Sequence, residues 1–188
     1  MTNVVLVGFR CAGKSTLGRM IAERLHRDFI DCDEYIEGKT HLSIREIFDI
    51  AGEGHFRKLE GDAIAEIVRQ DNRVIATGGG AALRYRNIRN LKRKGIIVFL
   101  EVQPDTAFER LAGDPCSTSR RPALTPATDP LKEIKEQVEY RRPYYRDAAD
   151  HVVKTDGREP KDIVTEIMKY LKERGFTDHG EDRDMAHA

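Results

Sequence analysis

The chain has 188 residues, of which 39% are hydrophobic and 34% are charged. This length is typical of one domain that buries its own core without disulfides or a structural metal. Lys and Arg number 32, as do Asp and Glu, which argues against binding to nucleic acid or membrane through an overall basic field. The cysteines at 11, 32 and 116 show no paired spacing, which is typical of free thiols in a reducing cytoplasm. The predicted core begins by residue 4, so we expect no targeting segment before it.

A glycine-rich motif follows the first predicted strand, residues 3–7. Residues 8–15 read G-x-x-x-x-G-K-S, the Walker A pattern, and residues 16–25 have the apolar spacing of a helix. The backbone N–H groups of such a loop surround phosphates, the lysine reaches the β- and γ-phosphates, and the serine hydroxyl can ligate Mg²⁺. A chance glycine turn is the weaker alternative, because four fixed residues lie in the required strand–loop–helix context. The residues expected at the nucleotide are Gly8, Cys11, Ala12, Gly13, Lys14, Ser15 and Thr16.

Strands and helices then alternate along the chain, which is typical of a parallel sheet with helices on both faces. A second strand begins at residue 29 and ends in Asp31-Cys32-Asp33. Further strands are expected at 74–77, 96–100 and 151–153. A helix should begin at about residue 44 and be interrupted at Gly52 and Gly54. Further helices are expected at 55–70, 104–111, 131–140 and 160–174. We therefore predict a three-layer αβα fold around a five-stranded parallel sheet.

Two segments differ in character from this pattern. Residues 113–130 contain four prolines, too many for a helix, and we expect a mobile functional loop there. Residues 175–188 are polar and aperiodic and are expected to form a disordered tail. The prediction is one domain over residues 1–174.

Unusual sequences lie at the carboxyl ends of the predicted strands, where open parallel sheets bind ligands. Asp31 and Asp33 are two residues apart, which in an extended chain puts both carboxylates on one side, suited to a metal and to a hydroxyl proton. Residues 78–80 are three glycines, which permit a close approach of backbone to substrate. The alternatives are that the aspartates cap a helix starting near Glu34 and that the glycines form only a tight turn.

Two arginine-containing stretches also allow a structural and a functional interpretation. Arg57 and Glu60 are i,i+3 neighbours on a predicted helix, which alone favours an exposed ion pair. Residues 141–146 read R-R-P-Y-Y-R, which alone favours a helix C-terminus whose cations complement the helix dipole. Functionally, a planar guanidinium is well matched to a substrate carboxylate.

Together these motifs resemble the shikimate kinase family. They are G-x-x-x-x-G-K-S-T-x-G-R at 8–19, F-I-D-x-D-x-x-I-E at 29–37, F-R-x-x-E at 56–60, T-G-G-G-A at 77–81, R-P-A-L at 121–124 and R-x-P-x-Y-R at 141–146. They occur in the order of the family and cover residues 1 to about 174. Walker A is shared by many activities, whereas D-x-D combined with F-R-x-x-E and the triple glycine is far more specific.

The resemblance implies a nucleoside-monophosphate-kinase-like P-loop fold with a lid at about 113–129. It implies that ATP phosphorylates the 3-hydroxyl of shikimate, with Mg²⁺, in chorismate and aromatic amino-acid biosynthesis. The implied partners are these small molecules, with no nucleic acid or membrane, and we expect a monomer.

The resemblance also implies a role for each matching residue. On the donor side these are Lys14 and Ser15 at the phosphates and metal, Asp31 near the metal, Arg110 against the adenine and Arg121 of the lid at the γ-phosphate. On the acceptor side they are Asp33 at the reacting hydroxyl, Arg57 and Arg141 at the carboxylate, and Gly78, Gly79 and Gly80 at the ring.

Two features depart from the family pattern, and two other functions are compatible with a P-loop. Arg10 puts a bulky cation in the loop, and the pair Arg120-Arg121 leaves two choices for the lid arginine. A kinase of gluconate or of a nucleoside monophosphate would share the P-loop, but it would not require two arginines placed with D-x-D. A GTPase switch would be expected to carry an N/T-K-x-D motif, which the sequence lacks.

Overall fold

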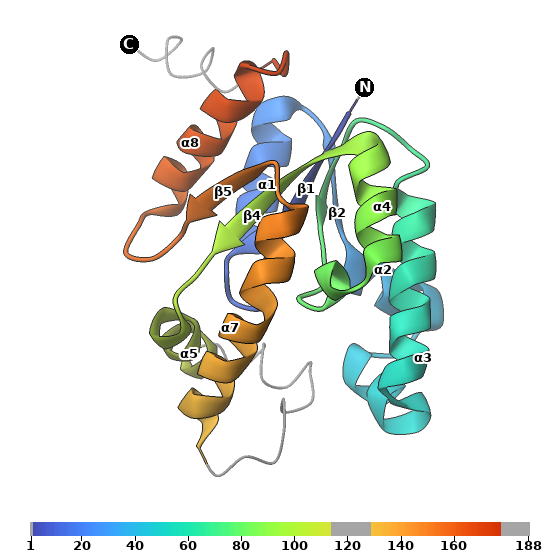
Figure 1. Cartoon of the computed structure of the whole chain (residues 1–188). Helices are drawn as coiled ribbons and strands as arrows, with labels where there is room; N and C mark the ends of the chain where they lie inside the picture. Colours follow the sequence, from blue (N-terminus) through green and yellow to red (C-terminus); the bar gives the residue numbers. More distant parts are fainter. Residues whose placement is uncertain (1, 114–128, 178–188) are drawn as a thin grey trace.

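A parallel sheet forms the centre of the computed structural model, which describes residues 2–113 and 129–177. The strands in these residues are β1 (Asn3–Val7), β2 (Asp28–Asp31), β3 (Arg73–Ala76), β4 (Gly95–Glu101) and β5 (His151–Lys154). Their spatial order is β2-β3-β1-β4-β5, and all neighbours pair in parallel (Figure 1). The predicted five-stranded parallel sheet is confirmed.

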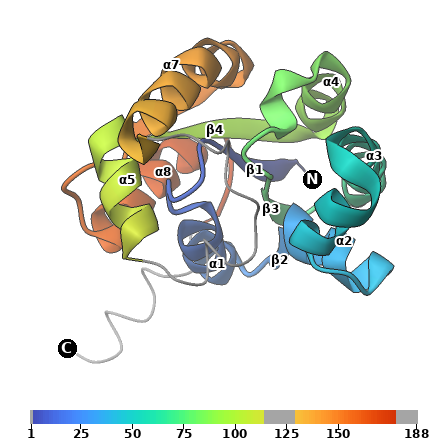
Figure 2. The same ribbon diagram turned by 90° about the horizontal axis from the view of Figure 1, so that it is seen from below.

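Helices cover both faces of this sheet (Figure 2). Their bounds are α1 (Lys14–Leu25), α2 (Cys32–Thr40), α3 (Ile44–Ile67), α4 (Tyr85–Lys94), α5 (Pro104–Ala112), α7 (Pro130–Ala148) and α8 (Pro160–Lys172), with a 3-10 turn at Ala81–Leu83. Helices α1 and α8 pack together under one face, whereas α4 and α7 pack against β4 on the other. The three-layer αβα architecture is therefore as predicted.

Several element bounds differ from those that the sequence predicts. Helix α2 begins at Cys32, directly after β2. Helix α4 was not predicted. Few apolar residues mark the buried side of either helix, so the sequence gives a weak signal for both. Helix α3 continues through a kink at Gly52, whose φ of 75° lies in the left-handed region. Helix α7 does not end at residue 140 but continues through Pro143 to Ala148.

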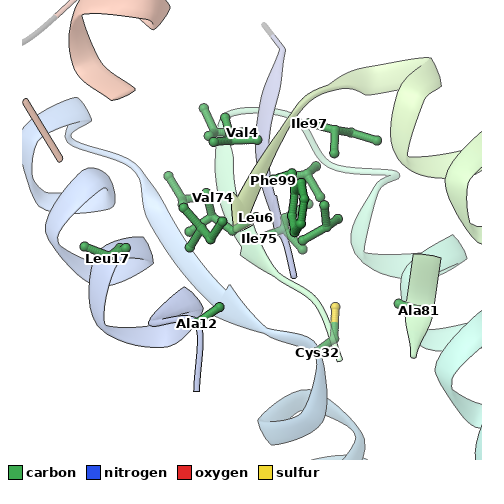
Figure 3. Close-up of a cluster of buried hydrophobic side chains, with 14 of the residues drawn as sticks. Val4, Leu6, Ala12, Leu17, Cys32, Val74, Ile75, Ala81, Ile97 and Phe99 are labelled. Carbon is green, nitrogen blue, oxygen red and sulfur yellow. The ribbon is translucent and has the colours of Figure 1, made fainter. Parts of the chain in front are cut away.

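The core lies between the central strands and the helices on each face. Every residue of β1 is completely buried, as expected for a strand with neighbours on both sides and helices on both faces. Figure 3 shows Val4, Leu6, Val74 and Phe99 of three adjacent strands in one cluster. This rigid centre fixes the positions of the loops that follow the strands.

The packed part of the chain extends past residue 174, the predicted end of the domain. Phe176 is 7% exposed and belongs to the core cluster. The guanidinium of Arg27 lies over its ring, 4.4 Å from the centroid. Gly175 turns the chain with a φ of 81°, which brings Phe176 back onto the domain.

Candidate active site

Four loops or strand ends with polar groups meet at the carboxyl edge of the sheet. The P-loop follows β1, Asp31 ends β2, the glycines 78–80 follow β3, and Glu101 ends β4. Because the strands are parallel and adjacent, the sequence motifs that follow them come together at one edge. The expected convergence is thus present in the fold.

The P-loop holds its lysine close to the backbone of the loop. Gly8 and Gly13 have φ values of 149° and 89°, and a Cβ on Gly8 would lie 2.6 Å from the carbonyl oxygen of Leu100. Lys14 is 9% exposed, and its Nζ donates hydrogen bonds to the carbonyl oxygens of Gly8 at 3.0 Å and Phe9 at 2.8 Å. The ammonium group therefore lies inside the loop, beside the N-terminus of α1.

Ser15 and Asp31 form a pair between the P-loop and the end of β2. The Ser15 hydroxyl donates to Oδ2 of Asp31 at 2.6 Å. The other oxygen of Asp31 accepts from the backbone N–H of Asp33 at 2.9 Å and caps α2. The capping alternative is therefore confirmed for Asp31, which at the same time contacts the P-loop serine.

The extended geometry expected for Asp31 and Asp33 is wrong. The two residues do not lie on one side of a strand, because α2 begins between them at Cys32. Asp33 is in the first turn of that helix, so its carboxylate lines a separate cavity. The D-x-D spacing thus assigns one aspartate to the P-loop and the other to the neighbouring cavity.

This neighbouring cavity has a volume of about 180 Å³. It is lined by Arg10, Asp33, Ile44, Phe48, Glu53, Phe56, Arg57, Glu60, Gly78, Gly79, Gly80, Gln137 and Arg141. All the residues that the sequence assigned to the acceptor are in this set, although they come from the regions of α2, α3, the glycine turn and α7. The lining combines aromatic rings with charged groups of both signs, as a site for a small polar ligand requires.

Arg57 is held by two carboxylates in this cavity. Its Nη1 donates to both oxygens of Glu60 at 3.1 and 3.0 Å, and its Nε and Nη2 donate to Oε1 of Glu53 at 3.1 and 3.0 Å. The side chains of Arg57 and Glu60 are 14% and 0% exposed, so the expectation of an exposed ion pair is wrong. Burial raises the pKa of Glu60, and the nearby Arg57 opposes that shift.

The triple glycine makes room for these charged side chains. A Cβ on Gly80 would lie 2.3 Å from Nη1 of Arg57, and one on Gly78 would lie 2.7 Å from Oε1 of Glu60. The guanidinium and the carboxylate therefore occupy space that a side chain at position 80 or 78 would take, so the glycines allow these groups to approach as well as forming a turn.

Arg141 reaches the cavity from the opposite side, on α7. Its Nη1 donates to the carbonyl oxygen of Gly79 at 3.5 Å, and its guanidinium lies 5.5 Å from the ring centroid of Phe9. The hydroxyl of Tyr145 donates to the same carbonyl oxygen. Arg141 and Arg57 thus border one cavity from two helices that are far apart in the sequence.

A second pocket, of about 410 Å³, adjoins the P-loop. Its lining includes the predicted nucleotide residues Cys11, Ala12, Gly13, Thr16 and Arg110. Arg110 donates to the carbonyl oxygens of Cys11 at 3.2 Å and Thr155 at 2.7 Å. Arg110 therefore lies at the wall of the pocket that adjoins the P-loop.

Sequence reasoning missed several residues at these sites. Glu60 was considered only as a surface partner of Arg57, and Arg10 only as an unusual loop residue, yet both line the cavity that contains Arg57 and Arg141. Thr155 and Arg158 line the second pocket without belonging to a recognisable motif. Arg120, the predicted lid residue Arg121 and most of the predicted lid lie outside the described residues.

A P-loop beside a small charged cavity, at the carboxyl edge of a five-stranded parallel sheet, defines a P-loop kinase of small molecules. A family model described as "SKI: Shikimate kinase" matches residues 10–172. The chain belongs to the shikimate kinase family.

Individual relatives agree with this assignment. The shikimate kinase of Symbiobacterium thermophilum is 42% identical over 173 residues, which are 92% of this chain and 98% of that protein. The structure of shikimate kinase from Acinetobacter baumannii in complex with shikimate is 32% identical, with a TM-score of 0.86 over 94% of this chain and 96% of that one. Shikimate kinase from Aquifex aeolicus is 34% identical, with a TM-score of 0.75 over 92% and 97%.

Proposed function

We propose that this chain transfers the γ-phosphoryl group of ATP to the 3-hydroxyl of shikimate, forming shikimate 3-phosphate and ADP in chorismate and aromatic amino-acid biosynthesis. The observation that carries this assignment is the cavity beside the P-loop, in which Arg57, Arg141 and Asp33 come together. Shikimate has one carboxylate, which the two arginines suit, and hydroxyl groups, which the aspartate suits. Phosphoryl transfer depends on positioning and charge neutralisation, which such a site can supply.

On the donor side, Lys14 and the P-loop backbone bind the phosphates. The lysine ammonium donates to two carbonyl oxygens of the loop. When ATP binds, it would exchange these acceptors for phosphate oxygens. Arg110 borders the pocket for the adenine, and Arg121 is the proposed lid cation at the γ-phosphate. Cys11, Ala12, Gly13 and Thr16 complete the nucleotide site.

The pair Ser15 and Asp31 fits Mg²⁺. A hydroxyl and a carboxylate are hard oxygen ligands, and Mg²⁺ is commonly held by one or two such groups together with phosphates and water. The Ser15 hydroxyl oxygen of the P-loop and Oδ2 of Asp31 at the end of β2 are 2.6 Å apart. Bound there, the ion would supply charge neutralisation at the phosphates.

On the acceptor side, Arg57 and Arg141 bind the carboxylate of shikimate, and Gly78, Gly79 and Gly80 border its ring. Asp33 accepts a hydrogen bond from the reacting hydroxyl and orients the oxygen or takes its proton. The phenyl rings of Phe48 and Phe56 line the same cavity, with centroids 4.8 Å apart. They offer an apolar surface to the ring carbons of the acceptor.

We further infer a cytoplasmic monomer that needs no nucleic acid or membrane. The described residues contain no helix that is both long and apolar enough to cross a bilayer. Neither Cys11 nor Cys32 forms a disulfide with another described residue, which suits a reducing compartment.

A coupled assay of ADP release tests the assignment with shikimate, gluconate and a nucleoside monophosphate as acceptors. Of these three acceptors, we expect only shikimate to be turned over. Its product should have a ³¹P signal that couples to the proton at carbon 3. Turnover with gluconate or the nucleotide, and none with shikimate, would overturn the proposed substrate.

A further inference from the structure

The helix that carries Arg141 is weakened where this residue lies. Pro143 is inside α7, and a proline in a helix interior removes one backbone hydrogen bond and clashes with the preceding turn. The backbone of the helix alone therefore fixes residues 141–146 less well than a regular helix would. Contacts outside the helix must hold this segment in place.

One external contact is with the glycine turn at the acceptor cavity. Tyr145 is 2% exposed, and its hydroxyl donates to the carbonyl oxygen of Gly79, as does Nη1 of Arg141. The Tyr145 ring stacks on Phe99 of β4, with centroids 5.1 Å apart. These contacts determine how closely α7 approaches the cavity.

The second external contact is a buried carboxylate at the end of β4. Glu101 is 2% exposed. Its Oε1 accepts from Arg146 Nη2 at 2.8 Å and Nε at 3.3 Å, and its Oε2 accepts from Nη2 at 3.2 Å. Arg142 Nε lies 3.5 Å from the same Oε1. One carboxylate thus ties together two arginines on either side of Pro143.

The backbone of Glu101 makes separate contacts on the donor side. Its carbonyl oxygen accepts from the N–H of Thr155 at 2.9 Å and from the Thr155 hydroxyl at 3.2 Å. Thr155 in turn accepts hydrogen bonds from Arg110. A change in the side chain of Glu101 leaves these donor-side contacts chemically intact.

We infer that Glu101 is a positioning residue that holds α7 through Arg142 and Arg146 and so sets the distance of Arg141 from the acceptor carboxylate. Glu101 does not line the acceptor cavity, so it acts through the helix and not on the substrate. A carboxylate is suited to this task because charge-assisted hydrogen bonds are shorter and stronger than neutral ones. The inference rests on the proposed function, in which Arg141 binds the carboxylate of shikimate.

The test compares Glu101→Gln with wild type in steady-state kinetics. The substitution keeps the shape of the side chain and removes its charge. We expect KM for shikimate to rise about tenfold, since small misplacements of a binding group are costly, while KM for ATP stays within about twofold. Glu139→Gln is the matched control, because Glu139 also pairs with Arg142 but its side chain is 58% exposed. This control should leave both constants unchanged.

A double mutant separates positioning from general stability. If Glu101 acts through Arg141, Glu101→Gln should raise KM for shikimate in wild type but add almost nothing in an Arg141→Ala background. Any change that Glu101→Gln makes in the melting temperature should be the same in wild type and in the Arg141→Ala background. If Glu101→Gln does not fold, Arg146→Gln replaces it, since that side chain is 56% exposed and the change should raise the same KM by a smaller factor.

The inference is overturned if the effects on KM are additive, if both KM values rise alike, or if only the melting temperature changes. If Arg141→Ala raises KM for shikimate and Glu101→Gln does not, the proposed function survives and the inference fails alone. A wild-type chain that does not phosphorylate shikimate overturns both.

Discussion

The Nη1 atom of Arg57 donates to both carboxylate oxygens of Glu60, and the Glu60 side chain is completely buried. Burial raises the pKa of Glu60 above its ordinary value of 4.5 despite this partner. The contribution of Glu60 to stability is therefore full below pH 4.5 and is lost as the pH rises through the raised pKa of the folded state.

Glu60→Gln should remove this dependence on pH. Urea unfolding of both proteins at a series of pH values would show the stability of wild type falling, relative to the variant, as the pH rises from about 4.5. A difference between the two proteins that is constant with pH, or that grows in favour of wild type, would contradict the raised pKa.

Lys14→Met should nearly abolish turnover and leave the affinity for shikimate almost unchanged. The Lys14 ammonium contacts the carbonyl oxygens of the P-loop and does not line the acceptor cavity, so its loss removes charge stabilisation during transfer. Single-turnover kinetics together with shikimate titration measure both properties. Retention of more than about a tenth of the wild-type kcat, a loss below about 1.4 kcal/mol, would remove Lys14 from the chemical step.

Glu53→Gln should lower KM for shikimate. Oε1 of Glu53 accepts from both Nε and Nη2 of Arg57, and this two-donor edge of the guanidinium is suited to any carboxylate. Glu53 is 65% exposed at the side chain, so we expect it to compete with the acceptor carboxylate for Arg57 and to be displaced when the acceptor binds. We expect a decrease of about two- to fivefold, as for an exposed ion pair. An increase in KM would mean that Glu53 orients Arg57 instead.

Phe176 should contribute to stability although it lies beyond the predicted domain end. Truncation after Arg174 removes a ring that is 7% exposed and contacts Arg27, whereas truncation after Thr177 keeps it. We expect the shorter protein to melt about 4–8 °C below the longer one, which corresponds to about 2 kcal/mol for a chain of this size. Equal melting temperatures would show that Phe176 adds nothing.

Strong local patterns predicted most of the fold. The apolar run of β1, the Walker A residues and Pro104 at the start of α5 each determine local structure with few neighbours involved. Helix α4 was missed because its ten residues include five Lys or Arg and few apolar side chains. Its position depends on packing against β4, which the local sequence does not show.

The candidate site was predicted in its residues but not in its geometry. The carboxyl-edge rule predicted that Asp33 and Gly79 lie close together, and the family resemblance added Arg57 and Arg141; all four line one cavity. Which partner each residue contacts depends on tertiary packing. The burial of Glu60 against the glycine turn, and the contact of Glu101 with Arg146, join elements that are remote in sequence.

We expect both Arg57 and Arg141 to bind the carboxylate of shikimate. Each charge-assisted contact should be worth about 1.5–3 kcal/mol, or about 10- to 150-fold. Arg57→Ala and Arg141→Ala should therefore each raise KM for shikimate by such a factor with little effect on KM for ATP. Lysine should rescue either position poorly, because a point charge does not reproduce the planar fork.

The most direct measurement is the ratio of kcat/KM for shikimate to that for its methyl ester, in wild type. The ester keeps the ring and hydroxyls but removes the charge that both arginines would bind, so two cations would lose their partner. We predict a preference for shikimate of at least about a hundredfold, reduced sharply in Arg141→Ala. Equal kcat/KM for the acid and the ester in wild type would contradict the carboxylate clamp.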